Sequence, residues 1–526
     1  MGDKSRNPCP YGENCTRKNP KHFMECTHPQ TQTTGESSSK RGFPSSSSDS
    51  GTVEKKVKYA PSTSEIMHDA ATVSTKSHKN KEMSPAHQVA LAEKCTKYRY
   101  YMSRVHHSID SSFNEGSSLT LHNVINGTQG NLIDSCWFSY MYDLNWIRQQ
   151  FKPEDRNKPM TVVEGLQGSS RIELLEQRNN YTNIKVIQAQ FSIPYGVHHT
   201  KMAILRYDKG IRIMITTANL IPLDWFHKSQ ALWCSPLCPL GNADSETNFK
   251  ADLIEYLEAY KSPILRDWAS TLSKYDMSKC KVFLIASVPG RHKQEKKFSF
   301  GHLKLRKVLE QHGPKASAAT WPVIGQFSSI GRLGADPSNW LTGEFLISLS
   351  TTLKSNARNK PALRLIYPTV EDVRTSLEGY QAGGSLPFSQ LQYNGQPYIR
   401  SLMHKWKSEC RGRTRAAPHI KSYLRLSPNN AIPWFLMTSS NLSKAAWGMA
   451  EKEDSQLMIR SYELGVLFLP KMFDTDSFVY DPTFADPKAF PVPFDLPPTQ
   501  YSSDDEIWIV DKSYRDKKDS VGDYWH

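Results

Sequence analysis

A histidine and a lysine separated by one residue occur twice in the sequence, as His199 with Lys201 and again as His419 with Lys421. Each pair opens an apolar, strand-like run. Alternate side chains of a strand point to the same face, so the two side chains of each pair are expected to lie side by side. One such pair would indicate little, because a single histidine in an apolar run is usually a hydrogen-bonded core residue. Two pairs in matching surroundings predict a repeated functional unit.

An asparagine follows each pair at a closely similar distance, after a second strand-like run. These residues are Asn219 and Asn441, and small hydroxyl residues precede both. If the two strands of each unit pair, the asparagine joins the histidine and the lysine. Two units related by approximate twofold symmetry would then bring two imidazoles, two ammonium groups and two amides to one site.

This set of groups suits a phosphodiester. Lysines and asparagines can hold the non-bridging oxygens and stabilise charge that develops at phosphorus. A neutral imidazole can attack phosphorus, while a protonated one gives its proton to the leaving oxygen and later activates water. No carboxylate cluster of the two-metal type accompanies the motifs, so we expect no catalytic metal.

The amino-terminal segment has a different composition and could bind a metal. Within residues 9–29, two cysteines and two histidines have the spacing C-x5-C-x6-H-x5-H, and they are Cys9, Cys15, His22 and His28. Four nitrogen and sulfur ligands can complete a tetrahedral Zn²⁺ shell, and a segment this short needs such a staple to fold. The alternative is a disordered tail that happens to contain these residues.

Composition narrows the class of protein. The chain has 526 residues, long enough for two or three domains, and a net charge of +14, which favours polyanionic partners. No apolar run approaches the length of a membrane span, and the first residues lack the apolar core of a secretory signal. Most of the nine cysteines are scattered, which favours a reducing compartment. Residues 30–88 are rich in Ser, Thr, Lys and Gly and are predicted to be a disordered linker.

From residue 89 the sequence alternates short apolar runs with amphipathic stretches. Strands are predicted at 186–193, 201–207, 211–218, 363–368, 434–440 and 464–470, and helices at 249–260 and 302–312. This alternation predicts an α/β fold with helices covering buried sheets. The repeat divides it into a first catalytic half, 89–280, and a second, 281–526.

Residues around the two motifs resemble those of a known family. With Asn in place of the usual Asp, the paired motif resembles the signature of the phospholipase D superfamily. The stretches GVHHTKMAIL, QFSSIGRLGAD, VRTSLEGYQAGGSLP, TSSNLSKAAWG and MIRSYELGVLFLP resemble the tyrosyl-DNA phosphodiesterase family within it. The resemblance extends from about residue 95 to the C-terminus. It implies two α/β domains related by a pseudo-twofold axis, with mixed sheets flanked by helices.

The same resemblance implies a reaction and assigns roles. Members of the family are DNA-repair hydrolases that remove the tyrosyl peptide of trapped topoisomerase I, and other blocking groups, from a DNA 3′ end. They act through a covalent phosphohistidine and leave a 3′-phosphate without a metal. His199 would be the nucleophile and His419 the general acid and then base. The groups that bind phosphoryl oxygens would be Lys201, Lys421, Asn219 and Asn441. Glu463 would orient His199, and Gln230 would orient His419, although by sequence alone Glu463 is merely a charged residue beside a strand.

The resemblance also outlines a DNA groove. Tyr195 matches an aromatic that stacks on a base, and Ser328, Ser329, Ser443 and Lys444 match contacts to the DNA backbone. Arg332 stands where a serine is common. Further positions match the cleft lining, each of which could also be core or surface: Tyr140, Arg291, Trp340, Gly384, Pro387, Arg460 and Trp508. Such contacts predict binding of single- and double-stranded DNA without base specificity.

The amino-terminal spacing resembles the zinc finger that binds poly(ADP-ribose). Tyr11, Arg17 and Lys18 match the polymer contacts, whereas Thr16 and Cys26 stand where that family has aromatics. The expected protein is a nuclear monomer with no membrane attachment, and the sequence leaves cytoplasmic and mitochondrial fractions open. Two other functions also stay open at this point: a phospholipase D-like lipid phosphodiesterase, and a non-catalytic binder of poly(ADP-ribose) or DNA.

Overall fold

The computed structural model describes residues 7–8, 26–27, 84–105, 111–127, 130–354 and 360–526. The chain divides into two units, Met1–Lys76 and Ser77–His526. In the first, β1 (Asn7–Pro8) pairs in parallel with β2 (Cys26–Thr27). Most of the predicted linker lies outside the described residues, as do the predicted zinc ligands and polymer contacts Cys9, Tyr11, Cys15, Arg17, Lys18, His22 and His28.

The second unit begins slightly earlier than the sequence predicts. Helix α2 spans Pro85–Tyr98, so the last residues of the range 30–88 are helical and not linker. Ser84 caps this helix by accepting a hydrogen bond from the backbone N–H of His87, and Pro85 occupies its first turn, where proline is tolerated.

Eight strands of the first half form one mixed sheet in the order β4-β3-β10-β9-β8-β5-β6-β7. In chain order they are β3 (Tyr100–Ser103), β4 (Ser118–Leu119), β5 (Leu132–Phe138), β6 (Met160–Glu164), β7 (Ile184–Gln188), β8 (Met202–Tyr207), β9 (Gly210–Thr216) and β10 (Ala231–Cys234). The strand predicted at 186–193 therefore ends at Gln188, and the chain turns before Tyr195, which has a left-handed φ of 64°.

Seven strands of the second half form another mixed sheet in the order β11-β21-β18-β16-β13-β14-β15. They are β11 (Phe283–Ser287), β13 (Val323–Gln326), β14 (Leu363–Ile366), β15 (Met403–His404), β16 (Ser422–Arg425), β18 (Phe435–Thr438) and β21 (Glu463–Phe468). Two small sheets accompany it, made of β12 (Gly290–Lys293), β20 (Gln456–Ile459) and β19 (Met449–Glu451), and of β17 (Ala431–Ile432) with β22 (Phe478–Val479).

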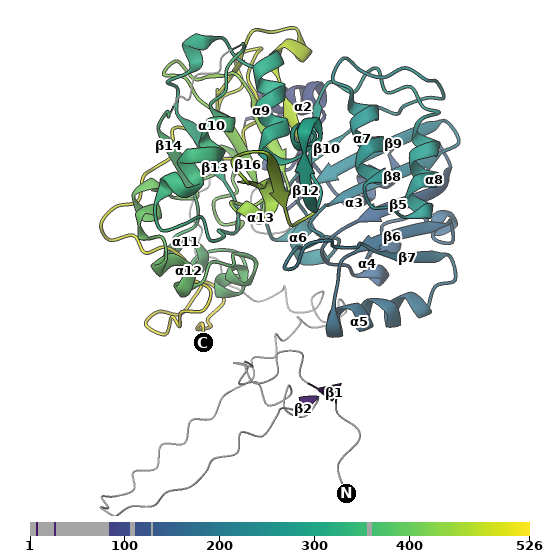
Figure 1. Cartoon of the computed structure of the whole chain (residues 1–526), viewed down its shortest axis with the longest axis horizontal. Helices are drawn as coiled ribbons and strands as arrows, with labels where there is room; N and C mark the ends of the chain where they lie inside the picture. Colours follow the sequence, from purple (N-terminus) through teal and green to yellow (C-terminus); the bar gives the residue numbers. More distant parts are fainter. Residues whose placement is uncertain (1–6, 9–25, 28–83, 106–110, 128–129, 355–359) are drawn as a thin grey trace, which may run out of the picture. The chain divides into compact units, whose positions relative to one another are not determined.

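The two large sheets repeat one strand pattern. The series β10-β9-β8-β5-β6-β7 corresponds to β21-β18-β16-β13-β14-β15: in each, the first three pairings are antiparallel and the last two are parallel. The predicted α/β architecture of two related mixed sheets is confirmed. Figure 1 shows the first sheet in blue to teal and the second in green to yellow.

Helices flank both sheets. They are α3 (Leu121–Asn126), α4 (Leu144–Gln149), α5 (Gly168–Asn179), α6 (Pro222–Phe226), α7 (Phe249–Glu258), α8 (Pro263–Leu272), α9 (Gly301–His312), α10 (Leu346–Leu349), α11 (Val370–Arg374), α12 (Gln390–Asn394) and α13 (Lys444–Trp447). Short 3₁₀ helices are η3 (Ser111–Phe113), η4 (Pro153–Asp155), η5 (Gln294–Phe298), η6 (Ala316–Ala318), η7 (Pro337–Asn339), η9 (Gly379–Ser385), η10 (Pro397–Leu402), η11 (Glu409–Arg411) and η12 (Pro470–Phe473), and η8 (Leu341–Phe345) is a π-helix.

One hydrophobic core joins the two halves. It includes Ile204 and Ile213 of the first sheet, Leu257 of α7, and Leu424 and Val466 of the second sheet. Because β8, β9, β16 and β18 are almost wholly buried, their ends are held rigidly at the junction of the halves. Within the described ranges, no helix is both long and apolar enough to cross a membrane.

Candidate active site

The backbone fixes each of the two motif histidines, His199 and His419, against the opposite half of the protein. The N–H of His199 donates to the carbonyl of Tyr462 at 2.9 Å, and the N–H of His419 donates to the carbonyl of Ser229 at 3.1 Å. Parallel β-bridges mark the same two crossings, His198 with Tyr462 and Ser229 with Pro418. Each histidine therefore precedes a strand of its own sheet but is anchored on the other half.

The side-chain partners are exchanged in the same way. Nδ1 of His199 lies 2.9 Å from Oε2 of Glu463, and Nδ1 of His419 lies 2.8 Å from Nε2 of Gln230. The two partners occupy equivalent positions in their sheets. Gln230 lies two residues before Leu232, which pairs with Thr216, and Glu463 lies two residues before Gly465, which pairs with Thr438.

Each partner is in turn held by a hydroxyl group from its own half. Ser439 Oγ donates to the carboxylate of Glu463 at 2.5 Å, and Thr217 Oγ1 donates to Oε1 of Gln230 at 2.7 Å. These hydroxyls follow Thr438 and Thr216 directly and thus also occupy equivalent positions. The sequence contained both as small residues before an asparagine, but their contact with the partners becomes visible only when the strands pair.

The two lysines are buried beside the histidines. Lys201 and Lys421 are 1% and 0% exposed, and each ammonium group donates to the backbone carbonyl of its neighbouring histidine, at 2.7 Å for Lys201. His199 and His419 are 9% and 7% exposed, so an edge of each ring still reaches the surface. A buried cation with this orientation suits binding of a phosphoryl oxygen.

The asparagines are held differently. Asn441 Oδ1 accepts hydrogen bonds from the N–H and hydroxyl of Ser328, which leaves its NH₂ group free to donate to a ligand. The backbone N–H of Asn219 donates to Asp224 at 2.8 Å, while its Oδ1 is buried with no hydrogen-bond partner among the described residues. An unsatisfied buried group of this kind is costly and is typical of a functional position.

Burial and neighbouring charges keep both histidines neutral in the absence of a ligand. Burial lowers the pKa of His199, with Lys201 and Lys421 acting in the same direction and Glu463 opposing them. Burial, and then the charge of Lys421, lowers the pKa of His419 to about 3. Burial also lowers the pKa of Lys201 to about 8 and that of Lys421 well below its ordinary value. A bound phosphodiester would bring negative charge to this place and raise all four pKa values.

The carboxylate that faces His199 is ionised. Burial by itself raises the pKa of a carboxyl group, but the contacts of Glu463 with His199 and Ser439 hold its pKa below the ordinary value. The ionised carboxylate of Glu463 accepts a hydrogen bond from the Nδ1–H of His199, so the lone pair of the neutral ring lies on Nε2. This tautomer is the one that a nucleophile needs.

Asp224 lies at the site but could not be selected from the sequence. Its Oδ2 lies 3.2 Å from Nδ1 of His419, and its carboxylate is 2% exposed. Lys228 lies 3.6 Å from Asp224 and 3.2 Å from Glu378, which completes a buried ionic chain. In the sequence, the only indication of its role was that it is the one acidic residue in the stretch Ile221–Phe226, soon after Asn219.

The residue next to His199 belongs to the core. His198 is fully buried, with Nδ1 3.3 Å from the carbonyl of Ser139 and Nε2 2.9 Å from the hydroxyl of Tyr260. Burial lowers its pKa to about 3. The two adjacent histidines therefore have separate environments, and only His199 faces the charged cluster.

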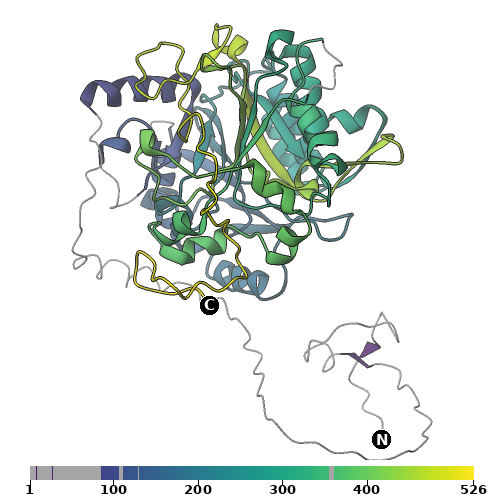
Figure 2. The same ribbon diagram turned by 90° about the vertical axis from the view of Figure 1, so that its left-hand side faces the viewer.

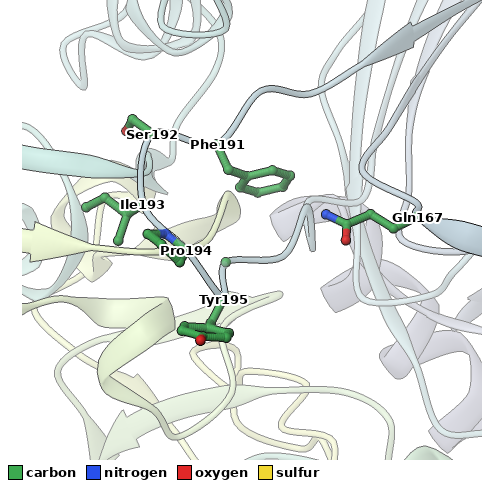
Figure 3. Close-up of a pocket in the computed structure, with 7 residues that line it drawn as sticks. Gln167, Phe191, Ser192, Ile193, Pro194 and Tyr195 are labelled. Atoms are coloured by element: carbon green, nitrogen blue, oxygen red, sulfur yellow. The ribbon is translucent and has the colours of Figure 1, made fainter. Parts of the chain in front are cut away.

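Tyr195 lies on an exposed and strained loop, residues 190–197, which we call the tyrosine loop. The side chain of Tyr195 is 90% exposed, and its backbone has a left-handed φ. This conformation is costly for a bulky residue and is often found at functional sites. The loop borders an open pocket of about 330 Å³. In Figure 3, Phe191 and Gln167 point toward one another, whereas the ring of Tyr195 points away from them.

The second half clamps the tyrosine loop. Arg460 Nη1 donates to the carbonyl of Pro194 at 2.8 Å, and Ser461 Oγ accepts from the N–H of Val197 at 3.2 Å. A Cβ at Gly196 would lie 1.9 Å from the carbonyl oxygen of Arg460, so only glycine allows this approach. The loop and His199 are thus fixed by one short segment, residues 460–463.

Other predicted groove residues are accessible. Tyr140 is 40% exposed, and its ring centroid lies 5.6 Å from that of His199. Arg332 is exposed, and Ser329, Ser443 and Lys444 are partly exposed. Of the more loosely assigned positions, Arg291 pairs with Glu451, the carbonyl of Pro387 accepts from Ser329, and a Cβ at Gly384 would meet open space.

Three of the predicted groove residues are placed differently. Trp340 is fully buried, stacks on Phe345 and donates from Nε1 to the carbonyl of Gly448, so it cannot contact DNA. Trp508 is also fully buried. Ser328 is 1% exposed and is used to hold Asn441, not to offer a free contact. The indole rings of Trp340 and Trp508 pack in the apolar core and therefore do not reach the surface.

The sequence matches two family models, Tyrosyl-DNA phosphodiesterase over residues 99–502 and PBZ domain over residues 6–31. A tyrosyl-DNA phosphodiesterase 1 of Drosophila melanogaster is 31% identical, over 96% of this chain and 99% of its own length. One from Arabidopsis thaliana is 36% identical over 78% of this chain and 74% of its own length. The crystal structure of the yeast enzyme, 24% identical, shares the fold with a TM-score of 0.60 over 78% of this chain and 99% of its own.

Proposed function

The chain belongs to the tyrosyl-DNA phosphodiesterase family, and we propose that it removes tyrosyl peptides of trapped topoisomerase I, and other blocking groups, from DNA 3′ ends. The observation that carries this proposal is the pair of histidines, each oriented by a partner from the opposite half. A lipid phosphodiesterase and a non-catalytic binder, the alternatives left by the sequence, have no support among these matches.

The first step transfers the phosphoryl group to the protein. Nε2 of His199 attacks phosphorus and forms a P–N bond, while the bond from phosphorus to the tyrosyl oxygen breaks. His419, whose pKa rises when the negatively charged substrate binds, gives its Nε2 proton to the departing phenolate. Lys201, Lys421, Asn219 and Asn441 hold the non-bridging oxygens.

The second step releases the DNA. Neutral His419 takes a proton from water, the resulting hydroxide attacks phosphorus, and the P–N bond to His199 breaks. The products are a 3′-phosphate and free His199 with its lone pair restored on Nε2. No step requires a metal ion, because lysine charge serves the stabilising role that Mg²⁺ has in other phosphodiesterases.

The DNA strand would follow the exposed groups around the histidines. Tyr195 offers a flat ring for a base, and Arg332, Ser443 and Lys444 offer donors for phosphates; Ser329 lies beside them, with its hydroxyl donating to the carbonyl of Pro387. Base stacking and phosphate contacts carry little sequence information, so any single- or double-stranded 3′ end is a suitable substrate.

The amino-terminal PBZ domain would recruit the enzyme to poly(ADP-ribose) at damaged DNA in the nucleus. Two thiolates and two imidazoles, from Cys9, Cys15, His22 and His28, are a donor set typical of structural Zn²⁺. The ion would supply the folding energy that so short a segment lacks. Tyr11, Arg17 and Lys18 would contact the polymer.

Cleavage of a 3′-phosphotyrosyl oligonucleotide in EDTA tests the proposed function. We expect the wild-type protein to release a 3′-phosphate oligonucleotide, and His199→Ala to be slower by at least about 10⁴-fold because the nucleophile is lost. Phosphatidylcholine offered in parallel should not be cleaved. Loss of wild-type activity in EDTA, or retained activity in His199→Ala, would contradict the mechanism.

A further inference from the structure

Two arginines are buried together at a distance from the catalytic cluster. Arg411 and Arg413 are 4% and 1% exposed and line one small cavity with Cys95, Tyr100 and Ser117. Gly412 between them has a left-handed φ of 60°, and a Cβ there would lie 2.5 Å from the ring of Phe113. The turn is therefore built so that both arginines face inward.

These guanidinium groups have few acceptors. Arg411 donates from Nε to the carbonyl of Val492 at 2.9 Å and lies 4.3 Å from the ring centroid of Phe484. Arg413 donates from Nη2 to Oδ1 of Asn114 at 3.1 Å. Nη1 of each arginine is buried without an acceptor in the described part of the chain.

No carboxylate in the described ranges compensates the two charges. Among the residues that the structure describes, neither arginine forms a salt bridge. The carboxylate of Asp495 accepts instead from the backbone N–H groups of Glu409 and Cys410. Burial, and then the charge of Arg411, lowers the pKa of Arg413 to about 9. Two buried charges without a partner are strongly unfavourable unless a negative group joins them.

The neutral groups of the cavity cannot provide that negative charge. Burial raises the pKa of Cys95 to about 12, so its thiol is uncharged, and the pKa of Tyr100 is likewise raised. The hydroxyl of Ser117 donates to the carbonyl of Phe113 at 2.9 Å. The described lining of the cavity therefore supplies no negative partner.

The size of the cavity limits what can enter. The centre of a sphere the size of a water molecule can lie anywhere within about 10 Å³ of it, which leaves room for one monatomic ion but not for phosphate or a carboxylic acid. A water molecule could accept hydrogen bonds but would leave the charge uncompensated. We propose that this arginine cavity binds one monatomic anion, chloride in the cell, between Nη1 of Arg411 and Nη1 of Arg413.

Such an ion would join two distant parts of the chain. Helix α2, which carries Cys95, packs on Phe484 and Ala489 of the second half and lies at the edge of the unit in Figure 2. Arg411 and Arg413 precede the strand that begins after His419. The anion would thus hold the start of the first half against the segment that leads to the general acid.

Bromide diffraction on the unaltered protein tests the site directly. Bromide replaces chloride and scatters anomalously, so crystals soaked in sodium bromide should show an anomalous peak within hydrogen-bond distance of both Nη1 atoms. Absence of a peak there, with an ordinary water or nothing in the cavity, would overturn the proposal.

Thermal unfolding at constant ionic strength provides a solution test. Replacing gluconate, which is too large for the cavity, with chloride should raise the Tm of the wild-type protein by about 1–3 °C. Arg411→Leu should lose this dependence on chloride. Arg425→Leu is the matched control: Arg425 is equally buried, but its guanidinium donates to the carbonyls of Ala319, Trp321 and Ser350. An equal chloride effect in Arg411→Leu and wild type would refute the assignment.

Discussion

Two chemically different partners distinguish the two catalytic histidines. Glu463 is an ionised acceptor, so it fixes the proton of His199 on Nδ1 and leaves Nε2 free to attack. Gln230 and Asp224 both approach Nδ1 of His419, one able to donate and the other to accept. His419 can therefore be supported both with and without a proton on Nδ1, as expected of a group that first gives and then takes a proton.

Replacing the second histidine should trap the reaction halfway. In His419→Ala, His199 can still attack phosphorus, but no group activates the water that breaks the P–N bond. We expect a covalent DNA adduct at His199 and overall turnover reduced by about 10²–10⁴-fold. Denaturing gels and peptide mapping would detect the adduct. The double variant His199→Ala, His419→Ala should form none, and complete absence of an adduct in the single variant would contradict the assigned roles.

Asp224 should act on catalysis through His419. Its carboxylate raises the pKa of His419 against the effects of burial and Lys421. In Asp224→Asn that support is lost, so the limb on which activity falls with rising pH should move to lower pH, and turnover at neutral pH should drop by about 10–100-fold. The pH–rate profile is the measurement.

A control separates this effect from a simple loss of structure. Asp252→Asn removes another carboxylate paired with a lysine, Lys304, which lies on α9. It should leave the pH profile unchanged. The same pH profile in Asp224→Asn as in the wild type would show that Asp224 does not tune His419.

Residue types that repeat could be predicted from their spacing, whereas single ones such as Glu463 and Gln230 could be predicted only through the family resemblance. The paired histidines, lysines and asparagines stood out because the spacing occurs twice. Asp224 has no counterpart, since Ala446 occupies the equivalent position five residues after Asn441. The burial of Trp340 and Trp508 was not predicted, because the sequence does not show whether a tryptophan lies in a core or lines a groove.

At the scale of elements, the tyrosine loop depends on a contact from the other half. The strand expected at 186–193 ends at Gln188, and the following residues become a loop whose shape is set by Arg460 and Gly196. A prediction from local hydrophobic periodicity does not include contacts between residues far apart in the sequence, so it could not detect this one. The strands that lead into Asn219 and Asn441 were predicted well because both are continuously apolar and buried.

Arg460→Ala should weaken DNA binding without altering the chemical step. Without the clamp on Pro194, the tyrosine loop can leave its strained conformation and Tyr195 loses its fixed orientation. We expect KM for the oligonucleotide to rise about 3- to 10-fold, part of the stacking free energy, with kcat little changed. Steady-state kinetics is the measurement.

Variants at Tyr195 and at Arg400 serve as comparisons for this prediction. Tyr195→Ala should raise KM at least as much as Arg460→Ala, whereas Tyr195→Phe keeps the ring and should behave as wild type. Arg400→Ala removes another arginine that holds backbone carbonyls, those of Ser502, Ser503 and Asp505, and should have no effect on KM. A fall in kcat alone would indicate that Arg460 acts on His199 instead.

At the scale of the whole molecule, recognition and chemistry are proposed for separate units. The PBZ match covers residues 6–31, and the phosphodiesterase match begins at residue 99. The zinc-ligand prediction rests on sequence alone, since these residues lie outside the described ranges. The division into two sheets could be predicted because the motif repeats, whereas the series of six strands that the sheets have in common became visible only from the pairing partners.

Disrupting the predicted finger should abolish recruitment and spare catalysis. In the double variant Cys15→Ala, His22→Ala, two of four zinc ligands are lost, so the segment should not fold around the ion. We expect loss of poly(ADP-ribose) binding and of accumulation at damaged DNA, with unchanged cleavage of a 3′-phosphotyrosyl oligonucleotide. Cys26→Ser, at a cysteine outside the predicted ligand set, is the control. Recruitment that persists in the double variant would refute the proposal.

The crossed partners of the two histidines have a consequence for dividing the chain. Neither half, produced alone, would possess an oriented imidazole, because the group that orients it is encoded in the other half. Subunits of a twofold dimer exchange contacts in the same way across their interface. An exact twofold copy would carry the same partner at both positions, whereas this chain has an acid at one and an amide at the other. Division of labour between donor and attacker therefore requires that the two halves differ.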